Sequence, residues 1–347
     1  MKIVALDDSW HQKYTDFLKE IEGALLYHSI AYRNLLLELL QCESEYYIAV
    51  ENEKVCGVLP LLKKKGAYGW VYNALPFYGS NGGILTTEER ILRALIDKYN
   101  QIITVQDVAS ATMISNPLVK ADLTKAKHDL VDERIGQFTK LDYPGDKAES
   151  LMSAFHQKTR NMIKKALKSG VDVEIDNGQM SFVYELHEEN IRAIGGKPKS
   201  KTFFDLIPKY FEAGKDFNIY LAQKDGKPIG ALLLFYFKDT VEYFTPVIVE
   251  EYRTYQPLSL IIYEAMVQSA CNGSTVWNWG GTWLTQEGVY RFKKRWGTAD
   301  IPYYYYTKIN NSELYMSSKE TLLSEYENFF VIPFHYLSNR GSENNGE

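Results

Sequence analysis

The sequence predicts an α/β or α+β protein that contains two copies of one fold. Segments with helical spacing of apolar residues alternate along the chain with short strand-like runs. A shift of 173 residues aligns two hairpin-like segments, with six identities in fifteen ungapped positions. The identical pairs are Tyr47/Tyr220, Ala49/Ala222, Lys54/Lys227, Gly57/Gly230, Leu59/Leu232 and Leu61/Leu234. The shift is half of the 347 residues, and this length suffices for two domains.

The elements expected in the first half follow from apolar spacing and from turn residues. Trp10, Tyr14 and Phe17 lie at helical spacing after Ser9, and Glu88 opens a later helix. The expected helices are 9–21, 29–40 and 88–99, and the expected strands are 46–50, 54–62 and 69–74. A glycine-rich loop, residues 76–83, follows the third strand.

The second half repeats this order after a break at Pro144-Gly145-Asp146. One long helix is expected from the break to about Ser169, with Leu151, Phe155, Met162 and Ala166 on its buried side. The strands expected after it are 171–175, 218–223, 227–237, 240–245 and 275–279, and the helices are 182–194, 202–213 and 255–272. This alternation predicts mixed sheets that are covered by helices.

Composition and charge restrict the class of protein. Apolar residues make up 45% and charged residues 24%, which excludes intrinsic disorder, and the net charge of −5 argues against a DNA-coating protein. The 26 tyrosines suit a groove for sugars, bases or extended ligands, or they simply populate strands. The six histidines show no metal-ligand spacing, so no metal site is expected.

The cysteines and the apolar runs bear on the compartment. Cys42, Cys56 and Cys271 form no CxxC pair, which favours a reducing cytoplasm. The N-terminus lacks the apolar core of a signal peptide, and the longest apolar run, 229–237, is too short to span a bilayer. A cytoplasmic protein is expected, with peripheral attachment to the inner face of the membrane left open. The polar tail 338–347 is expected to be flexible.

Several stretches of the second half occur in an order and spacing that are typical of one family. They are TRNMIKKALKSGV (159–171), FFDL (203–206), DGKPIGA (225–231), YRTYQP (252–257), GGT (280–282) and GVYRFKKRWG (288–297). With these stretches, residues 145–300 resemble the FemAB/FemX family of non-ribosomal aminoacyl transferases and related acetyltransferase-like proteins of envelope polysaccharide biosynthesis. The first half matches more loosely, through 28–34 and 75–83.

The resemblance implies two tandem GNAT-like (acyl-CoA N-acyltransferase) domains. An acceptor-side domain would take residues 1–143 plus 309–337, and a donor-side domain would take 144–308. The implied activity is aminoacyl or acyl transfer to an amine of a cell-envelope precursor, of peptidoglycan type or sugar-linked. The implied partners are the 3′ end of an aminoacyl-tRNA as co-substrate and a nucleotide- or lipid-linked precursor, with no tightly bound cofactor.

The donor is not fixed by the residues. GNAT proteins that use acyl-CoA usually carry R-x-x-G-x-G/A at a helix start, where backbone N–H groups hold the pyrophosphate. Here Arg253 is followed by Thr254-Tyr255-Gln256-Pro257-Leu258, so both glycines are replaced and Pro257 lacks an N–H. This disfavours acyl-CoA. A CoA-dependent N-acetyltransferase acting on an amino sugar or other amine stays an alternative, as does a non-catalytic module that binds a glycan precursor.

Acyl transfer requires donors for the developing oxyanion and a cleft for the acyl group. Splayed strands 227–237, 240–245 and 275–281 would form the cleft, and Gly280 and Gly281 would permit close approach of a ligand. The resemblance places Phe292 and Lys293 beside the donor, where the lysine meets the tRNA end or the oxyanion. The remaining candidates are Glu242 and Tyr243 as catalytic groups on opposite faces of one strand, and Tyr255 and Arg291 as substrate-binding groups.

Two further surfaces are candidates for substrate binding. Arg160, Lys164 and Lys168 follow one another at i, i+4 and i+8, as a cationic stripe for phosphates or as a solvated helix face. In the first domain, Tyr78 and Asn81 lie in the glycine-rich loop, which could form an anion-binding nest or a plain turn. The family's lysine for the acceptor diphosphate would fall near Leu36, and Arg33 is the nearest cation. The acceptor is therefore expected to differ from the muramyl pentapeptide.

Overall fold

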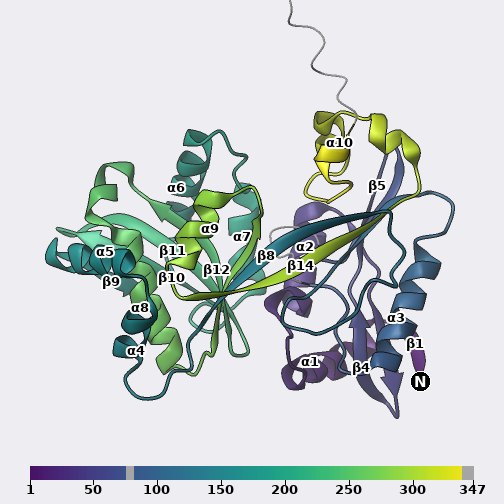
Figure 1. Cartoon of the computed structure of the whole chain (residues 1–347), viewed down its shortest axis with the longest axis horizontal. Coiled ribbons are helices and arrows are strands. Elements are labelled where there is room, and N and C mark those ends of the chain that lie inside the picture. Colours follow the sequence, from purple (N-terminus) through teal and green to yellow (C-terminus); the bar gives the residue numbers. More distant parts are fainter. Residues whose placement is uncertain (76–81, 338–347) are drawn as a thin grey trace, which may run out of the picture. The chain divides into compact units, whose positions relative to one another are not determined.

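Two compact units make up the chain in the computed structural model, which describes residues 1–75 and 82–337 (Figure 1). Unit 1 contains Met1–Arg134 and the chain from Pro302 onward, and unit 2 contains Ile135–Ile301. Two strands carry the chain from one unit into the other, β8 (Leu130–Lys140) and β14 (Thr298–Ile309). Tyr78, Asn81 and the tail 338–347 lie outside the described residues.

Unit 1 alternates strands and helices in the order expected from the sequence. Its strands are β1 (Lys2–Ala5), β2 (Glu43–Ser44), β3 (Tyr47–Glu51), β4 (Lys54–Leu59), β5 (Leu62–Gly66), β6 (Gly69–Asn73) and β7 (Val108–Ile114). Its helices are α1 (His11–Glu20), α2 (Ile30–Leu40), α3 (Glu89–Ile102) and α10 (Lys319–Glu325). β6 and β7 are parallel, whereas β5 and β6 are antiparallel, so the sheet is mixed.

Unit 2 has the same alternation. Its strands are β9 (Val171–Ile175), β10 (Phe217–Lys224), β11 (Lys227–Phe237), β12 (Thr240–Ile248) and β13 (Val276–Trp283). Its helices are α4 (Lys147–Ala154), α5 (Gln157–Lys168), α6 (Met180–Ala193), α7 (Lys201–Tyr210), α8 (Pro257–Cys271) and α9 (Glu287–Lys294). β12 and β13 are parallel within an otherwise antiparallel run from β9 to β12. The prediction of an α/β fold with mixed sheets is confirmed.

The hairpin repeat seen in the sequence extends to strand register. Tyr47 pairs with Leu59 and Ala49 with Gly57 in β3–β4, just as Tyr220 pairs with Leu232 and Ala222 with Gly230 in β10–β11. A bulge interrupts both ladders at the same place, between Ala49 and Val50 and between Ala222 and Gln223. Because register and bulge are set by long-range pairing, their recurrence indicates two copies of one fold.

The two copies also share the order of their elements and a helix cap. The order β1-α1-α2-β3-β4/β5-β6-α3-β7 in unit 1 matches β9-α6-α7-β10-β11-β12-α8-β13 in unit 2. Ser29 caps α2 by accepting from the N–H of Tyr32, and Ser200 caps α7 by accepting from the N–H of Phe203. Each copy therefore places a helix hairpin, a meander of strands and a crossover helix in the same sequence.

The two expected elements that differ from the structure are both interrupted. The strand expected over 54–62 is divided into β4 and β5 around Pro60, which cannot donate to a ladder. The helix expected from the break at residue 146 to Ser169 is divided into α4 and α5, because Phe155 is extended and His156 caps the second helix. In α5 the buried residues are Thr159, Ile163 and Ala166, while Met162 is only half-buried.

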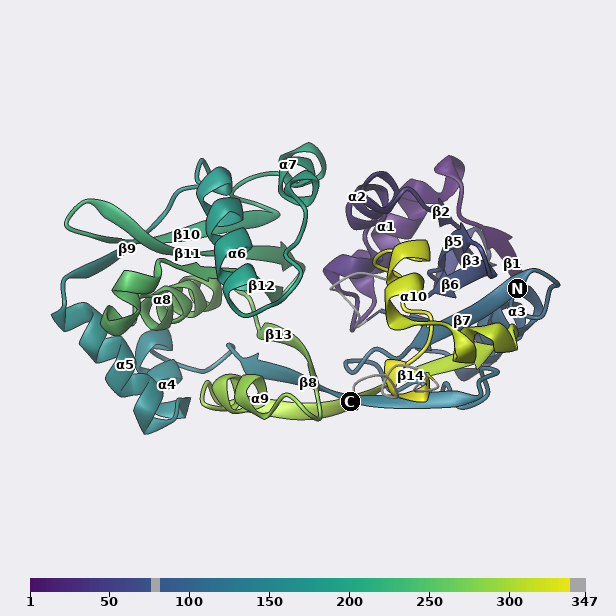
Figure 2. The same ribbon diagram turned by 90° about the horizontal axis from the view of Figure 1, so that it is seen from above.

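Helices cover both faces of the sheet in unit 2 (Figure 2). On one face, Tyr220, Leu232 and Val241 pack with α8 in a cluster that also contains Trp277 and Trp296. On the other face, Phe203 of α7 stacks on Phe244, and Phe211 contacts Phe235. Each face thus has its own hydrophobic core, as expected for a sheet buried on both sides.

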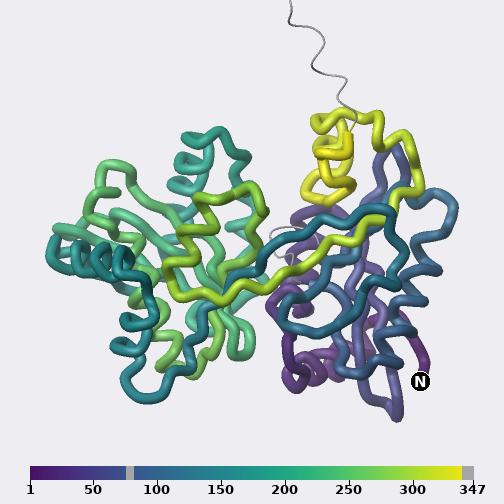
Figure 3. Tube along the Cα trace, viewed as in Figure 1, coloured from purple at the N-terminus to yellow at the C-terminus, as the bar shows by residue number. Residues whose placement is uncertain are grey.

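The C-terminal segment of the described chain lies in unit 1, as the trace in Figure 3 shows. The Tyr326 hydroxyl donates to the carbonyl of Gly69 at 2.8 Å, and the Phe330 N–H donates to Asn73 Oδ1 at 2.7 Å. These bonds fix the segment onto β6. None of the helices among the described residues is long and apolar enough to cross a membrane.

The glycine that both hairpins share, Gly57 in unit 1 and Gly230 in unit 2, leads to a prediction about stability. A Cβ at Gly57 would lie 2.8 Å from Ile91 Cγ2 and 3.1 Å from Leu95 Cδ1. Because this helix–strand contact cannot open freely, Gly57→Ala should destabilise the protein by about 1–3 kcal/mol, measured as a lower thermal melting midpoint. Gly288→Ala is the control, since a Cβ there meets nothing within 4 Å. Equal midpoints for both variants would contradict the close approach.

Candidate active site

The parallel strands of unit 2 separate after only three paired positions. β12 and β13 pair at Thr240–Val276, Val241–Trp277 and Glu242–Asn278, although β12 continues to Ile248 and β13 to Trp283. In unit 1 the corresponding strands pair through Asn73–Thr112, the last residue of β6. Among the described residues, this early separation of two parallel strands, the splay, therefore occurs in unit 2. Beyond it, β12 and β13 are no longer hydrogen-bonded to each other.

Polar side chains hold the base of this splay. Asn278 Nδ2 donates to Glu242 Oε2 at 2.9 Å, and the Gly280 N–H donates to Asn278 Oδ1 at 2.8 Å. Glu242 is 1% exposed and Asn278 is fully buried. The Glu242 carboxylate is thus tied to the strand on the other side of the splay. It orients β13, and it is too enclosed to meet solvent directly.

Lys293, on α9, contacts residues 280–282 of β13, directly after Asn278 and Trp279. Its ammonium Nζ donates to Thr282 Oγ1 at 2.9 Å, to the Gly281 carbonyl at 3.1 Å and to the Gly280 carbonyl at 3.4 Å. The side chain is buried, and burial lowers the pKa of Lys293 to about 8. Since an ammonium has three donors, these three acceptors satisfy it. The structure therefore brings three sequence candidates, Lys293, Gly280 and Gly281, into contact.

A second layer of polar groups supports Lys293. The Thr282 hydroxyl donates to Gln137 Oε1 at 3.1 Å, and Gln137 Nε2 lies 3.4 Å from both the Tyr290 carbonyl and Thr298 Oγ1. Gln137, Thr282 and Asn278 were not among the sequence candidates. Their signal in the sequence is a polar residue at an inward position of an otherwise apolar strand, as in Trp277-Asn278-Trp279.

Aromatic rings form one wall of the site. Trp279 lies 4.8 Å from Tyr243 and 6.0 Å from Phe292, measured between ring centroids, and its Nε1 donates to Thr139 Oγ1 at 2.9 Å. Burial raises the pKa of Tyr243, so its hydroxyl stays protonated at neutral pH. Tyr243 and Phe292 are therefore parts of an aromatic wall, with Glu242 on the opposite face of β12 from Tyr243.

The other candidates in unit 2 do not join this network. Arg160 donates to the Phe155 carbonyl, Lys164 is exposed, and Arg291 forms an exposed ion pair with Glu287 at 3.3 Å. The Tyr255 ring lies 6.0 Å from that of Tyr252. Across the described part of the chain, no hydrogen bond, ion pair or ring contact links these four residues to Lys293.

The start of α8 lacks the geometry of a glycine-rich cradle. A 3₁₀ turn over Glu250–Tyr255 leads into Gln256, which has φ 62° in the left-handed region that glycine usually supplies. Pro257 is the first helical residue and contributes no N–H. Arg253 is paired with Glu250 at 2.9 Å. The departure from the acyl-CoA pattern noted in the sequence is therefore present in the backbone as well.

Arg33 of unit 1 sits in a separate cluster. Its Nη1 lies 3.3 Å from His11 Nε2, and its guanidinium lies 5.5 Å from the centroid of the Tyr46 ring. Leu36, where the family's lysine would fall, is fully buried. Tyr78 and Asn81 cannot be added to this cluster, since they fall outside the described residues.

The protein has two GNAT-like units, and a family match covers most of the second of them. Residues 153–294 match the family model of the acetyltransferase (GNAT) domain. No curated protein matches the chain in sequence.

Solved structures agree on the fold. FemX superimposes with a TM-score of 0.71 at 17% identity, over 91% of this chain and 99% of FemX. The C-terminal domain of a putative lysylphosphatidylglycerol synthetase from Agrobacterium fabrum gives a TM-score of 0.57 at 11% identity, over 93% and 99%. A tandem GNAT protein from the clavulanic acid biosynthesis pathway gives 0.51 at 13% identity, over 89% and 98%. The resemblance to FemX drawn from the sequence is thus confirmed as a shared fold.

The hydroxyl between Lys293 and Gln137 provides a test of the network. Thr282→Val keeps the shape but removes the acceptor closest to the ammonium, so the free energy of unfolding should fall by about 1–3 kcal/mol. Thr282→Ser retains the hydroxyl and should stay near wild type. Urea denaturation at pH 7 compares the two variants. A valine variant as stable as the serine variant would mean that Thr282 does not hold Lys293.

Proposed function

We propose that the protein transfers an aminoacyl group from an aminoacyl-tRNA to an amine of a cell-envelope precursor. The observation that carries the proposal is the cluster of Lys293 with Gly280, Gly281 and Thr282, directly beyond the last paired position of β12 and β13. A GNAT-type enzyme needs its acyl carbonyl in such a splay, with positive charge close to the developing oxyanion.

The reaction exchanges an ester for an amide. The amine nitrogen attacks the carbonyl carbon of the aminoacyl ester, and a C–N bond forms. The C–O bond to the tRNA then breaks, and the leaving 3′ oxygen takes up the proton lost by the amine. No activated serine or cysteine lies in the described network, so a direct transfer without a covalent enzyme intermediate fits the residues present.

Lys293 would act on the oxyanion through charge. Its ammonium binds the carbonyls of Gly280 and Gly281, and this polarises the two peptide groups so that their N–H groups become stronger donors. The low dielectric around a 6% exposed ammonium increases its effect on a negative charge in the splay. Phe292 and Tyr243 would exclude water from the same space.

The choice of donor rests on two features. Gln256 and Leu258 replace the glycines that would hold a CoA pyrophosphate, and Pro257 between them lacks an N–H, which disfavours acyl-CoA. Arg160, Lys164 and Lys168 on α5 give a cationic stripe that suits a phosphate backbone. The CoA-dependent N-acetyltransferase remains the second candidate, since the matching family model is that of an acetyltransferase domain.

The acceptor is proposed by analogy to the structural relatives. One relative is described as a putative lysylphosphatidylglycerol synthetase, a name that links an amino acid to a membrane lipid. A nucleotide- or lipid-linked precursor with a free amine, of peptidoglycan type or sugar-linked, fits this chemistry. Such a precursor would be met in the cytoplasm or at the inner face of the membrane.

Replacing Lys293 tests the central role. Lys293→Ala should lower turnover at least roughly 10²-fold, the size expected when an oxyanion-stabilising group is lost. Lys294→Ala is the matched control, because Lys294 lies next to it on α9 but is exposed and paired with Asp300 at 2.9 Å. Single-turnover transfer of a radiolabelled amino acid measures both. Normal turnover in folded Lys293→Ala would refute the site.

The protonation of Lys293 also predicts a pH dependence. Because the pKa of Lys293 is lowered to about 8, its charge is complete below that pH and is lost as the pH rises through it. Turnover should therefore fall above about pH 8 in the wild type. Lys293→Arg, which stays charged, should lose this alkaline limb while it retains part of the activity. An unchanged limb in the arginine variant would assign it to another group.

Ligand-induced stabilisation separates the two donors. A ligand that binds the folded state raises the melting temperature by mass action. Aminoacyl-tRNA should raise it, less so in 0.3 M salt and less so in Arg160→Ala/Lys164→Ala, because phosphate contacts are salt-sensitive. Acetyl-CoA should leave the melting temperature unchanged. Stabilisation by acetyl-CoA alone would favour the N-acetyltransferase.

A further inference from the structure

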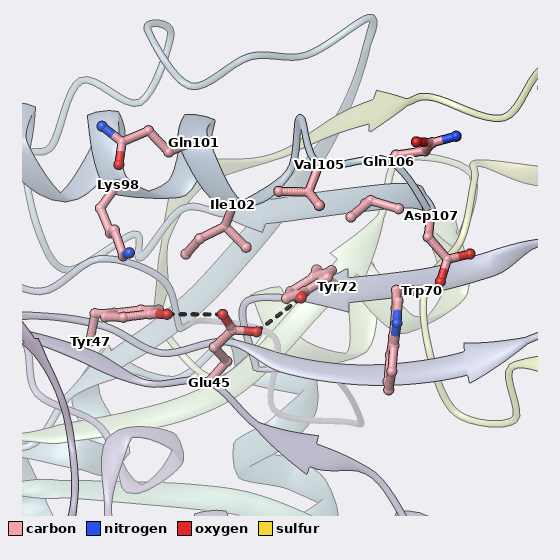
Figure 4. Close-up of a pocket in the computed structure, with 11 residues that line it drawn as sticks. Glu45, Tyr47, Trp70, Tyr72, Lys98, Gln101, Ile102, Val105, Gln106 and Asp107 are labelled. Carbon is pink, nitrogen blue, oxygen red and sulfur yellow. Dashed lines mark hydrogen bonds between the residues drawn. The ribbon is translucent and has the colours of Figure 1, made fainter.

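A pocket of about 400 Å³ opens in unit 1, between the sheet and the C-terminal half of α3 (Figure 4). Tyr47, Trp70 and Tyr72 line it from the strands, and Lys98 and Gln101 line it from the helix. The volume is in the range of small-molecule sites. The pocket lies at the start of the parallel pair β6–β7, where Trp70 pairs with Val108. None of its residues takes part in the network around Lys293.

A carboxylate organises the floor of the pocket. Glu45 accepts from the hydroxyls of Tyr47 and Tyr72, at 2.9 Å each, and forms an ion pair with Lys63 at 3.0 Å. Burial raises the pKa of Glu45, but the bonds from Lys63 and the two tyrosines outweigh burial and hold the pKa below its usual value. Glu45 is therefore ionised at neutral pH. It fixes both phenol rings, and each phenol oxygen keeps a lone pair for a ligand.

The charges around the pocket nearly cancel. Lys63 pairs with Glu45, and Lys65 pairs with Asp107 at 3.0 Å. Lys98 lies over the Tyr47 ring, 4.3 Å from its centroid, and no ion pair to it occurs among the described residues. One unpaired cation in a balanced site does not attract a phosphate strongly. The pocket suits a neutral ligand with hydroxyl groups, which Lys98, Gln101 and the phenol oxygens can bind.

The duplicated fold shows that the pocket is not a by-product of the architecture. In unit 2 the positions equivalent to Tyr47, Lys63 and Trp70 are Tyr220, Leu234 and Val241, by hairpin register. Strand pairing matches Leu234 with Lys63 and not with Leu61, because unit 1 has two more residues than unit 2 at the break between β4 and β5. These three residues of unit 2 are at most 2% exposed and belong to the hydrophobic core beneath α8. Unit 1 has polar or larger aromatic groups at two of these positions and leaves Tyr47 and Trp70 half-exposed. Half-exposed aromatic faces beside polar groups are typical of a binding surface.

We propose that this pocket binds one sugar ring of a neutral saccharide. The Nζ atoms of Lys63 and Lys65 lie over the Trp70 ring, 4.9 and 5.6 Å from its centroid, and the apolar C–H face of a pyranose would pack on the part of the ring that stays exposed. The sugar hydroxyls would bond to the phenol oxygens, to Gln101 and to Lys98. The proposal concerns unit 1 alone and does not depend on the transfer reaction. It accounts for part of the tyrosine surplus of the sequence.

Saturation-transfer NMR on the full chain tests the proposal with two probes, methyl β-D-glucopyranoside and methyl N-acetyl-β-D-glucosaminide. At least one should bind saturably, with the strongest transfer at ring C–H protons. Trp70→Ala should weaken binding at least roughly tenfold, and Trp70→Phe, which keeps an aromatic face, should weaken it less. Trp10→Phe is the control, since Trp10 lies outside the pocket.

Three results would overturn the proposal. The first is that neither glycoside binds the wild type. The second is that folded Trp70→Ala binds a glycoside as well as the wild type does, and the third is that inorganic phosphate displaces the glycoside, which would indicate an anion site. If Trp70→Ala does not fold, Gln101→Ala replaces it, because Gln101 is exposed and lines the pocket. Binding that is unchanged in Gln101→Ala and in Trp70→Phe would then count against the site.

Discussion

The pairing of β12 with β13 ends after three positions, and the candidate site depends on the hydrogen bonds that the backbone of β13 makes beyond that point. Beyond Glu242–Asn278 the ladder ends, yet buried carbonyls and N–H groups must still find partners. Asn278 accepts from the Gly280 N–H, and the Lys293 ammonium takes the carbonyls of Gly280 and Gly281. The buried ammonium thus bonds two backbone carbonyls next to the splay, and these two bonds together with the one to Thr282 offset the cost of its burial.

The two units show how one backbone was used in two ways. At the third position after the hairpin, unit 1 has Val71 opposite Ser110, and unit 2 has Glu242 opposite Asn278. Unit 1 continues its ladder beyond that point to Asn73–Thr112, whereas unit 2 opens there. A buried carboxylate–amide pair at the point of opening orients both strands. The two units therefore share this topology and differ in the side chains at the matched position.

Much of the fold could be predicted from the sequence because it is repeated within it. The six identities at a spacing of 173 residues mark the shared hairpin, and turn residues such as Asp225-Gly226 locate its tip. Register and bulge could not be predicted, since they arise from pairing between strands. The break at His156 was missed because the apolar spacing continues across it, and only the backbone conformation of Phe155 ends α4.

Candidate residues of the site could be predicted from the sequence where they stand in short motifs, and not where they come from distant strands. Lys293, Gly280 and Gly281 stand in short motifs and were found, whereas Gln137 contributes from a strand 145 residues before Thr282 and carries no motif. Arg160 and Tyr255 also stand in motifs, yet no described contact joins them to Lys293. Motifs therefore identified residues that the fold joins in one network, but they could not distinguish these from motif residues that no described contact joins to it.

The pocket and the splay lie at opposite ends of equivalent strand pairs, and this has a physical reason. A parallel strand pair with a crossover helix can open a space at either end, at the start of the two strands or where they separate. Unit 2 fills the first end with Tyr220, Leu234 and Val241 and opens the second, while unit 1 pairs its strands as far as the last residue of β6 and opens the first end around Trp70. Because each copy keeps one end packed, it can hold an open site at the other and still retain a continuous core.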